Sequence, residues 1–102
     1  MLILVAIEEE LKRSKFPNHQ IEYVGVGKVN AVLNTLKAIE KHSPQQIINF
    51  GTAGTLDENI KGLVEVSSFF QRDMDASPLG FKVGQTPFEE DIEITFGREG
   101  VT

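Results

Sequence analysis

The hydrophobic pattern of the chain opens with a continuous apolar run at residues 1–7. A run this short and uninterrupted is typical of a strand buried on both faces of a sheet. A second apolar stretch, at residues 21–26, predicts the next strand. A third, at residues 47–50, follows the breaker Ser43-Pro44 and predicts another buried strand.

Between the second and third strands, apolar residues recur at the spacing of a helix. They form one stripe, made by Val29, Val32 or Leu33, Leu36 and Ile39. The charged residues of this segment lie off the stripe, which is the pattern of an amphipathic helix over residues 28–41. Ser43-Pro44 is expected to end the helix.

The second half of the chain predicts shorter strands separated by turns. Strands are expected at residues 63–70, 81–83 and 92–96, with an acidic loop at 87–91 and turns at 77–80 and 97–100. Residues 101–102 read as the start of another element, as in a truncated chain. We therefore predict one α/β domain over residues 1–102, with a mixed central sheet flanked by helices.

Composition narrows the classes of protein to be considered. A length of 102 residues allows one small domain with one core. Hydrophobic content of 40% and charged content of 25% are ordinary for a soluble globular protein. The net charge of -5, without any basic run, argues against a nucleic-acid partner.

The residue types also bear on metals, cofactors and membranes. The chain has no cysteine, so neither a disulfide framework nor a thiolate metal site can form. His19 and His42 are too far apart to indicate a local metal pair, and no cofactor is expected. No apolar stretch approaches a membrane span, and Glu8, Glu9 and Glu10 interrupt any signal-like segment. We expect a cytoplasmic protein with no membrane partner.

The first candidate site is the glycine-rich turn that follows the third strand. Gly51 and Gly54 would let the backbone approach a ligand closely, and Thr52 adds a hydroxyl between them. Ligands of open α/β sheets bind beyond the carboxyl ends of the strands, where this turn is expected. The spacing of two glycines is equally compatible with a plain strand-to-loop turn.

Two acidic clusters are further candidates. The triplet at residues 8–10 is either charge at a helix start or a carboxylate pointing back over the sheet edge. Asp73 and Asp75 share one face of a strand, either as a general acid/base pair or cation site, or as solvated groups paired with Arg72. Lys28 does not belong to a phosphate loop, because Val29 follows it where serine or threonine is needed.

Three motifs in order carry a family resemblance: the acidic triplet, VGVGKVNA at residues 24–31 and NFGTAG at residues 49–54. Together they resemble the nucleoside phosphorylase and nucleosidase superfamily, and most closely its methylthioadenosine/S-adenosylhomocysteine nucleosidases. The likeness runs from Leu2 to about Thr102. Members of that family are usually much longer, so the sequence resembles their N-terminal half.

The resemblance implies cleavage of the N-glycosidic bond of an adenine nucleoside. Glu10 matches the glutamate that holds and activates the attacking water, and Thr52 stands where the family commonly has a water-placing serine. Ala53 and Gly54 match positions that line the adenine pocket, and Ile7 matches a residue packed under the ribose.

The resemblance also implies a homodimer. Leu79 and Pro87 match positions that reach into the neighbour's site to cover the alkylthio tail. Leu79 stands where phenylalanine is usual, and this difference affects the expected pocket for the tail and the identity of the substrate.

Two other functions stay open on the sequence. In a phosphorylase of this superfamily, glycine and arginine after the first strand hold phosphate, whereas here three carboxylates would repel a dianion. A non-catalytic binding or dimerisation module is the other alternative. It is favoured because the family's base-protonating aspartate and ribose-gripping glutamate lie beyond residue 102.

Overall fold

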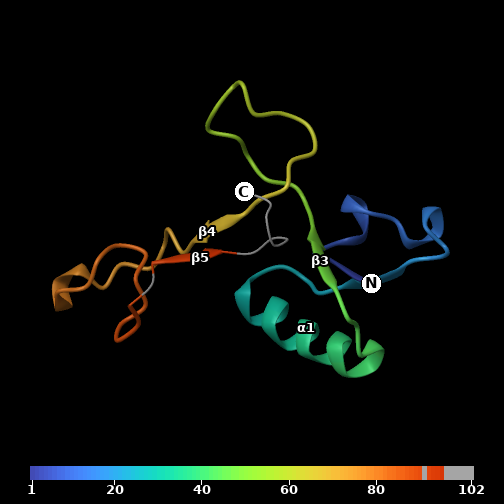
Figure 1. Ribbon diagram of the computed structural model, residues 1–102, viewed down its shortest axis with the longest axis horizontal. Helices are drawn as coiled ribbons and strands as arrows, with labels where there is room; N and C mark the ends of the chain where they lie inside the picture. Colours follow the sequence, from blue (N-terminus) through green and yellow to red (C-terminus); the bar gives the residue numbers. More distant parts are fainter. Residues whose placement is uncertain (91, 96–102) are drawn as a thin grey trace. The chain divides into compact units, whose positions relative to one another are not determined.

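The computed structural model describes residues 1–90 and 92–95, and it confirms the α/β class. Contacts within the chain divide it into two compact units, Met1–Gly54 and Thr55–Thr102, called here the first and second units (Figure 1). Each unit is described by itself. The prediction that the whole chain is one domain stays a prediction.

The first unit is built on a three-stranded parallel sheet of order β2-β1-β3. Its strands are β1 (Leu2–Val5), β2 (Gln20–Tyr23) and β3 (Ile47–Phe50). In this register Val5 lies between Tyr23 and Phe50, so all three strands end at the same edge. The three predicted strands are confirmed, although the first two are shorter than the apolar runs.

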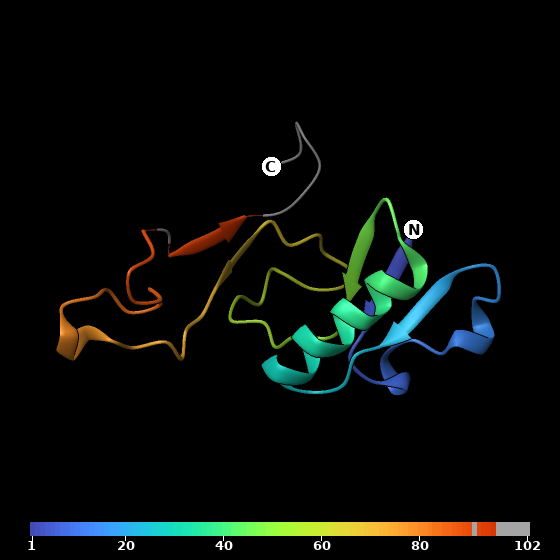
Figure 2. The same ribbon diagram turned by 90° about the horizontal axis from the view of Figure 1, so that it is seen from below.

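The single long helix predicted from the apolar stripe is confirmed as α1 (Lys28–His42). Gly27, at φ 94°, precedes its first residue, and Ser43 ends it in the left-handed conformation at φ 45°. The helix carries the chain from β2 to β3 and runs alongside the sheet (Figure 2). It contributes Ala38 to a small core with Leu2, Leu4 and Val24.

The core covers less of the first unit than the sequence predicts. Ile47 and Ile48 of β3 are 41% and 36% exposed, so the prediction of a buried third strand is wrong for this sheet. Edge position alone does not explain this, because β2 is also an edge strand and its Ile21 is only 3% exposed. The physical reason is cover, since within the described residues the core of this unit contains no residue of β3. The α1 stripe is also open to solvent, with Val29 81% exposed.

The second unit contains an antiparallel pair, β4 (Ser68–Phe70) and β5 (Glu93–Thr95), and a short 3-10 helix η3 (Ser77–Leu79). Parallel and antiparallel pairs therefore lie in two separate sheets of the described residues, not in one mixed sheet. The strand predicted at 63–70 is confirmed only over its last three residues.

The strand predicted at 81–83 is wrong. The chain turns at Val83-Gly84, where Gly84 adopts φ 86°. The turn and new element predicted at residues 97–102 lie outside the described residues. The described part of the chain contains no helix whose length and hydropathy would let it span a membrane.

Candidate active site

The candidate site lies where β1 and β3 end side by side. After β1 the chain enters a 3-10 turn, η1 (Glu8–Glu10), and after β3 it enters the glycine-rich turn. The carboxylate oxygen Oε2 of Glu10 accepts hydrogen bonds from the Thr52 backbone N–H at 2.6 Å and from the Thr52 hydroxyl at 2.9 Å. Two residues far apart in sequence meet because their strands are adjacent and parallel.

The local backbone explains why the third glutamate of the triplet turns inward. Ile7 is extended, with φ -136° and ψ 153°, and the Glu10 N–H then donates to the Ile7 carbonyl at 3.1 Å. This single tight turn brings Glu10 round to the sheet edge, whereas Glu8 and Glu9 stay exposed. The geometry thus separates Glu10 from the other two acidic residues.

Gly51 makes room for this contact. A Cβ built at Gly51 would lie 3.1 Å from Glu10 Oε2, which is closer than ordinary van der Waals contact. The sequence predicts a glycine that lets a ligand approach the backbone, and in the structure the group that approaches is the Glu10 carboxylate. Among the described residues other than its two chain neighbours, none has an atom within 4 Å of a Cβ built at Gly54.

The electrostatics of Glu10 follow from these two donors. Hydrogen bonds from the Thr52 N–H and then from its hydroxyl lower the pKa of the Glu10 carboxyl below its ordinary value. The group is therefore a carboxylate at neutral pH. Both Thr52 donors reach Oε2, which leaves Oε1 to accept a hydrogen bond from a water or substrate.

The other predicted site residues divide between the two units. Ile7, Ala53 and Gly54 are exposed and lie at the same edge as Glu10, directly before η1 and directly after Thr52. Leu79, 77% exposed at the end of η3, and Pro87 belong to the second unit. Their contact with a neighbouring subunit's site stays a prediction.

Of the predicted acidic pair Asp73 and Asp75, Asp75 has a local structural role. Asp75 accepts a hydrogen bond from the Ser77 N–H at 3.0 Å, at the start of η3. Contacts with the Ser77 hydroxyl and N–H lower the pKa of Asp75. Among the described residues, no group of three or more histidine, cysteine or acidic side chains could hold a metal ion.

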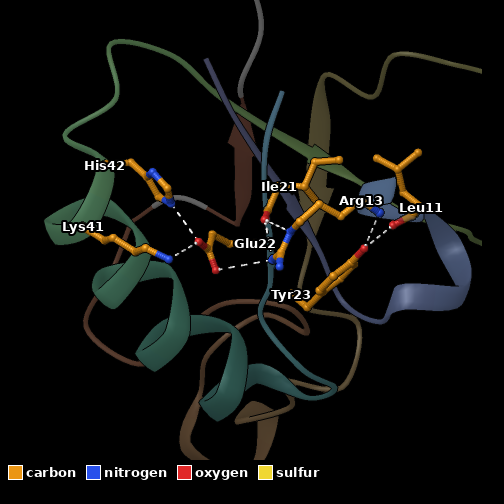
Figure 3. A network of polar contacts seen from close by, with 7 residues as sticks. All are labelled: Leu11, Arg13, Ile21, Glu22, Tyr23, Lys41 and His42. Atoms are coloured by element: carbon orange, nitrogen blue, oxygen red, sulfur yellow. Dashed lines mark hydrogen bonds and ion pairs between the residues drawn. The ribbon is translucent and has the colours of Figure 1, made fainter. Parts of the chain in front are cut away.

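The sequence reasoning missed a polar network on β2 (Figure 3). The Glu22 carboxylate accepts from Lys41 Nζ at 3.0 Å and His42 Nε2 at 2.7 Å, both at the end of α1. Tyr23 lies beside it and contacts the segment that follows Glu10. The available signal was the presence of a charged and a polar aromatic residue inside an otherwise apolar strand.

Comparison with known proteins defines the class. The sequence profile described as "Phosphorylase superfamily" matches residues 18–97. The chain therefore belongs to the phosphorylase superfamily. The match includes Thr52 but not Glu10, so the placement of Glu10 depends on the resemblance and on the geometry above.

Two similar proteins carry more particular names. The chain is 40% identical over 77 residues to the "5'-methylthioadenosine/S-adenosylhomocysteine nucleosidase" of Staphylococcus haemolyticus (strain JCSC1435), covering 69% of this chain and 34% of that protein. It is 45% identical over 65 residues to the protein of the same name from Staphylococcus aureus (strain JH9), covering 62% and 28%. The chain thus spans about a third of the length of these relatives.

Proposed function

We propose that this chain supplies the water-activating part of a nucleosidase that hydrolyses the N-glycosidic bond of an adenine nucleoside. Methylthioadenosine and S-adenosylhomocysteine are the substrates named by its relatives. The observation that carries the proposal is the Glu10 carboxylate, held on two Thr52 donors at the carboxyl edge of a parallel sheet. This is the edge at which open α/β sheets bind their ligands.

The chemistry requires a negative group that also accepts a proton. As the bond from the ribose to adenine breaks, positive charge develops on the sugar, and an adjacent carboxylate stabilises it. Water then adds to the sugar carbon, and Glu10 takes the proton of that water. The electron pair of the broken bond leaves with adenine, which must be protonated by another group.

Thr52 acts in this scheme by fixing the base. Both of its donors are used on Oε2, so the other oxygen of Glu10 is left to bind the attacking water in this scheme. Ile7, Ala53 and Gly54 flank this pair and would contact the nucleoside. The family resemblance implies two further groups beyond residue 102: an aspartate that protonates adenine and a glutamate that grips the ribose. We infer that the activity requires this C-terminal part.

The assembly that we propose is a homodimer in the cytoplasm, in which Leu79 and Pro87 cover the alkylthio tail in the partner's site. A leucine at position 79 offers a smaller and more flexible cover than the phenylalanine usual in the family. The length of the alkylthio group that is accepted would therefore distinguish this protein from its relatives.

A phosphorylase is the second candidate, favoured by the superfamily to which the chain belongs. The exposed Glu8 and Glu9 and the ionised Glu10 disfavour it, because they would repel a phosphate dianion.

The deciding experiment is adenine release from methylthioadenosine by the complete enzyme, with and without inorganic phosphate. We expect an unchanged rate and free methylthioribose as the product. Strict dependence on phosphate, with a sugar 1-phosphate as product, would overturn the proposal in favour of the phosphorylase.

A further inference from the structure

The segment that carries Glu10 has little internal structure to hold it in place. Between β1 and β2 it forms two three-residue 3-10 turns, η1 and η2 (Arg13–Lys15), and neither contains a buried residue. Such short 3-10 pieces have poor hydrogen-bond geometry and are marginal by themselves. The position of Glu10 must therefore be set by contacts with the sheet.

One of these contacts is made by a single phenol. The Tyr23 hydroxyl donates to the Leu11 carbonyl at 2.7 Å and accepts from the Arg13 N–H at 2.8 Å. It thus binds the chain on both sides of Lys12, starting at the residue directly after Glu10. Tyr23 is the last residue of β2 and pairs with Val5 of the central strand, so its backbone is well fixed.

Arg13 adds to this attachment, because its own side chain contacts β2. Its Nε and Nη2 atoms donate to the carbonyl of the buried Ile21 at 3.2 Å and 2.8 Å. Its guanidinium carbon lies 5.1 Å from the centre of the Tyr23 ring, within the range of a cation–π contact. Nη2 also lies 4.0 Å from Glu22 Oε2, so residues 11–13 contact three successive residues of β2 (Figure 3).

Glu10 is consequently held from two sides. Its side chain contacts Thr52 after β3, and the backbone that follows it is attached to β2, on the other side of β1. We propose that Tyr23 and Arg13 are positioning residues, which fix the backbone after Glu10 so that its carboxylate meets Thr52. This inference rests on the proposed function of Glu10 as the base.

The test is Tyr23→Phe in the complete enzyme, which removes the hydroxyl and keeps the ring. Small displacements of catalytic groups are costly, and we expect kcat to fall about tenfold while KM for methylthioadenosine stays within about twofold. The acid limb of the pH–rate profile should also move to higher pH. This follows because a misplaced Glu10 loses the Thr52 donors that lower its pKa.

Asn34→Ala is the matched control. It removes a partly buried side-chain hydrogen bond of 2.8 Å to the Val24 carbonyl, which joins α1 to the end of β2 without touching residues 11–13. We expect lower thermal stability for both variants, but an unchanged kcat and acid limb for the control. If Tyr23→Phe behaves like Asn34→Ala, the positioning role is wrong.

A double variant tests the positioning role of Tyr23 separately from the role of Glu10 as the base. In a Glu10→Gln background, Tyr23→Phe should cause no further loss of rate, because the group that it positions is already inactive. A full additional tenfold loss would overturn the positioning role and leave Glu10 as the base. An unchanged rate in Glu10→Gln alone would overturn the proposed function, and the positioning role with it.

Discussion

Two carboxylates of the first unit, Glu10 and Glu22, are held in different ways. Glu10 accepts hydrogen bonds from the neutral N–H and hydroxyl of one residue, Thr52. Glu22 contacts Lys41, His42 and Arg13, and so is surrounded by groups that are cationic or become so on protonation. Neutral donors orient a carboxylate and leave its charge uncompensated, whereas cations compensate it.

The pKa of each carboxyl is lowered, so the direction of the shift does not separate the two roles. For Glu10 the cause is first the Thr52 N–H, and for Glu22 it is first the hydrogen bond with His42 and then that with Lys41. Structural ion pairs and reactive groups both perturb pKa values. The difference lies in the partners and in the place, because Glu10 lies beyond the strand ends and Glu22 lies within β2.

The largest effect that this comparison predicts is for Glu10→Gln in the complete enzyme. The amide keeps the shape but has no negative charge for the ribosyl cation and cannot take a proton from water. Loss of a general base typically costs about 100- to 10,000-fold in rate. We expect at least that loss of kcat, measured by adenine release, with nucleoside binding by calorimetry largely kept.

Glu8→Gln and Glu9→Gln are the controls, because they remove the same charge from exposed positions in the same turn. Equal losses for all three variants would mean that the triplet is ordinary charge at a helix start. Loss of nucleoside binding together with rate would make Glu10 a ligand-positioning residue and not a base.

The next effect concerns the donors. Thr52→Val keeps the backbone N–H and the shape of the side chain, but removes the hydroxyl that donates at 2.9 Å. With one of two donors lost, the pKa of Glu10 should rise and kcat should fall about tenfold, since a misplaced base is inefficient. The pH–rate profile measures both the pKa of Glu10 and kcat. Thr52→Ser, which keeps a hydroxyl, should restore the two values. A valine variant with an unshifted acid limb would contradict the contact.

Much of this arrangement follows from the sequence. The strands of the first unit and α1 are predictable because their apolar patterns are local, and β1 and β3 then place the acidic triplet and Thr52 at one edge. Burial of β3 is not predictable, because it depends on which other parts of the chain pack over its side chains. The attachment of residues 11–13 by Tyr23 is also hidden, since hydrogen bonds to loop carbonyls leave no periodic signal.

A smaller effect on kcat is expected from a substitution at Gly51, where the Glu10 carboxylate lies close to the backbone. Gly51→Ala places a methyl group 3.1 Å from Glu10 Oε2. Gly51 does not have a positive φ, so alanine causes no backbone strain there and acts only by crowding. Because the carboxylate can yield by a few tenths of an ångström, we expect a loss of kcat of only about threefold, smaller than for a misplacement of 1 Å. An unchanged or increased rate would show that the close approach is incorrect.

The smallest effect on rate is expected for Glu22→Gln, which tests the other carboxylate. Its partners tie β2 to the end of α1 and to η2, and the glutamate side chain is 23% exposed. We expect no more than a twofold change in kcat, and a fall in the free energy of unfolding of about 1 kcal/mol by urea denaturation at neutral pH. Glu40→Gln removes an equal charge from an exposed position of α1 and should change neither quantity.

The difference in the free energy of unfolding between the wild type and Glu22→Gln should depend on pH, and this dependence is the more specific test. Because the folded-state pKa of Glu22 is lowered, its stabilisation is fully present above the pKa of the unfolded chain. The stabilisation is lost as the pH falls through the lower, folded-state pKa, where the carboxylate takes up a proton. The wild type and Glu22→Gln should therefore converge in stability in acid and differ most at neutral pH. A difference that stays constant across this range would mean that Glu22 acts by packing, and that its charge contributes nothing to the fold.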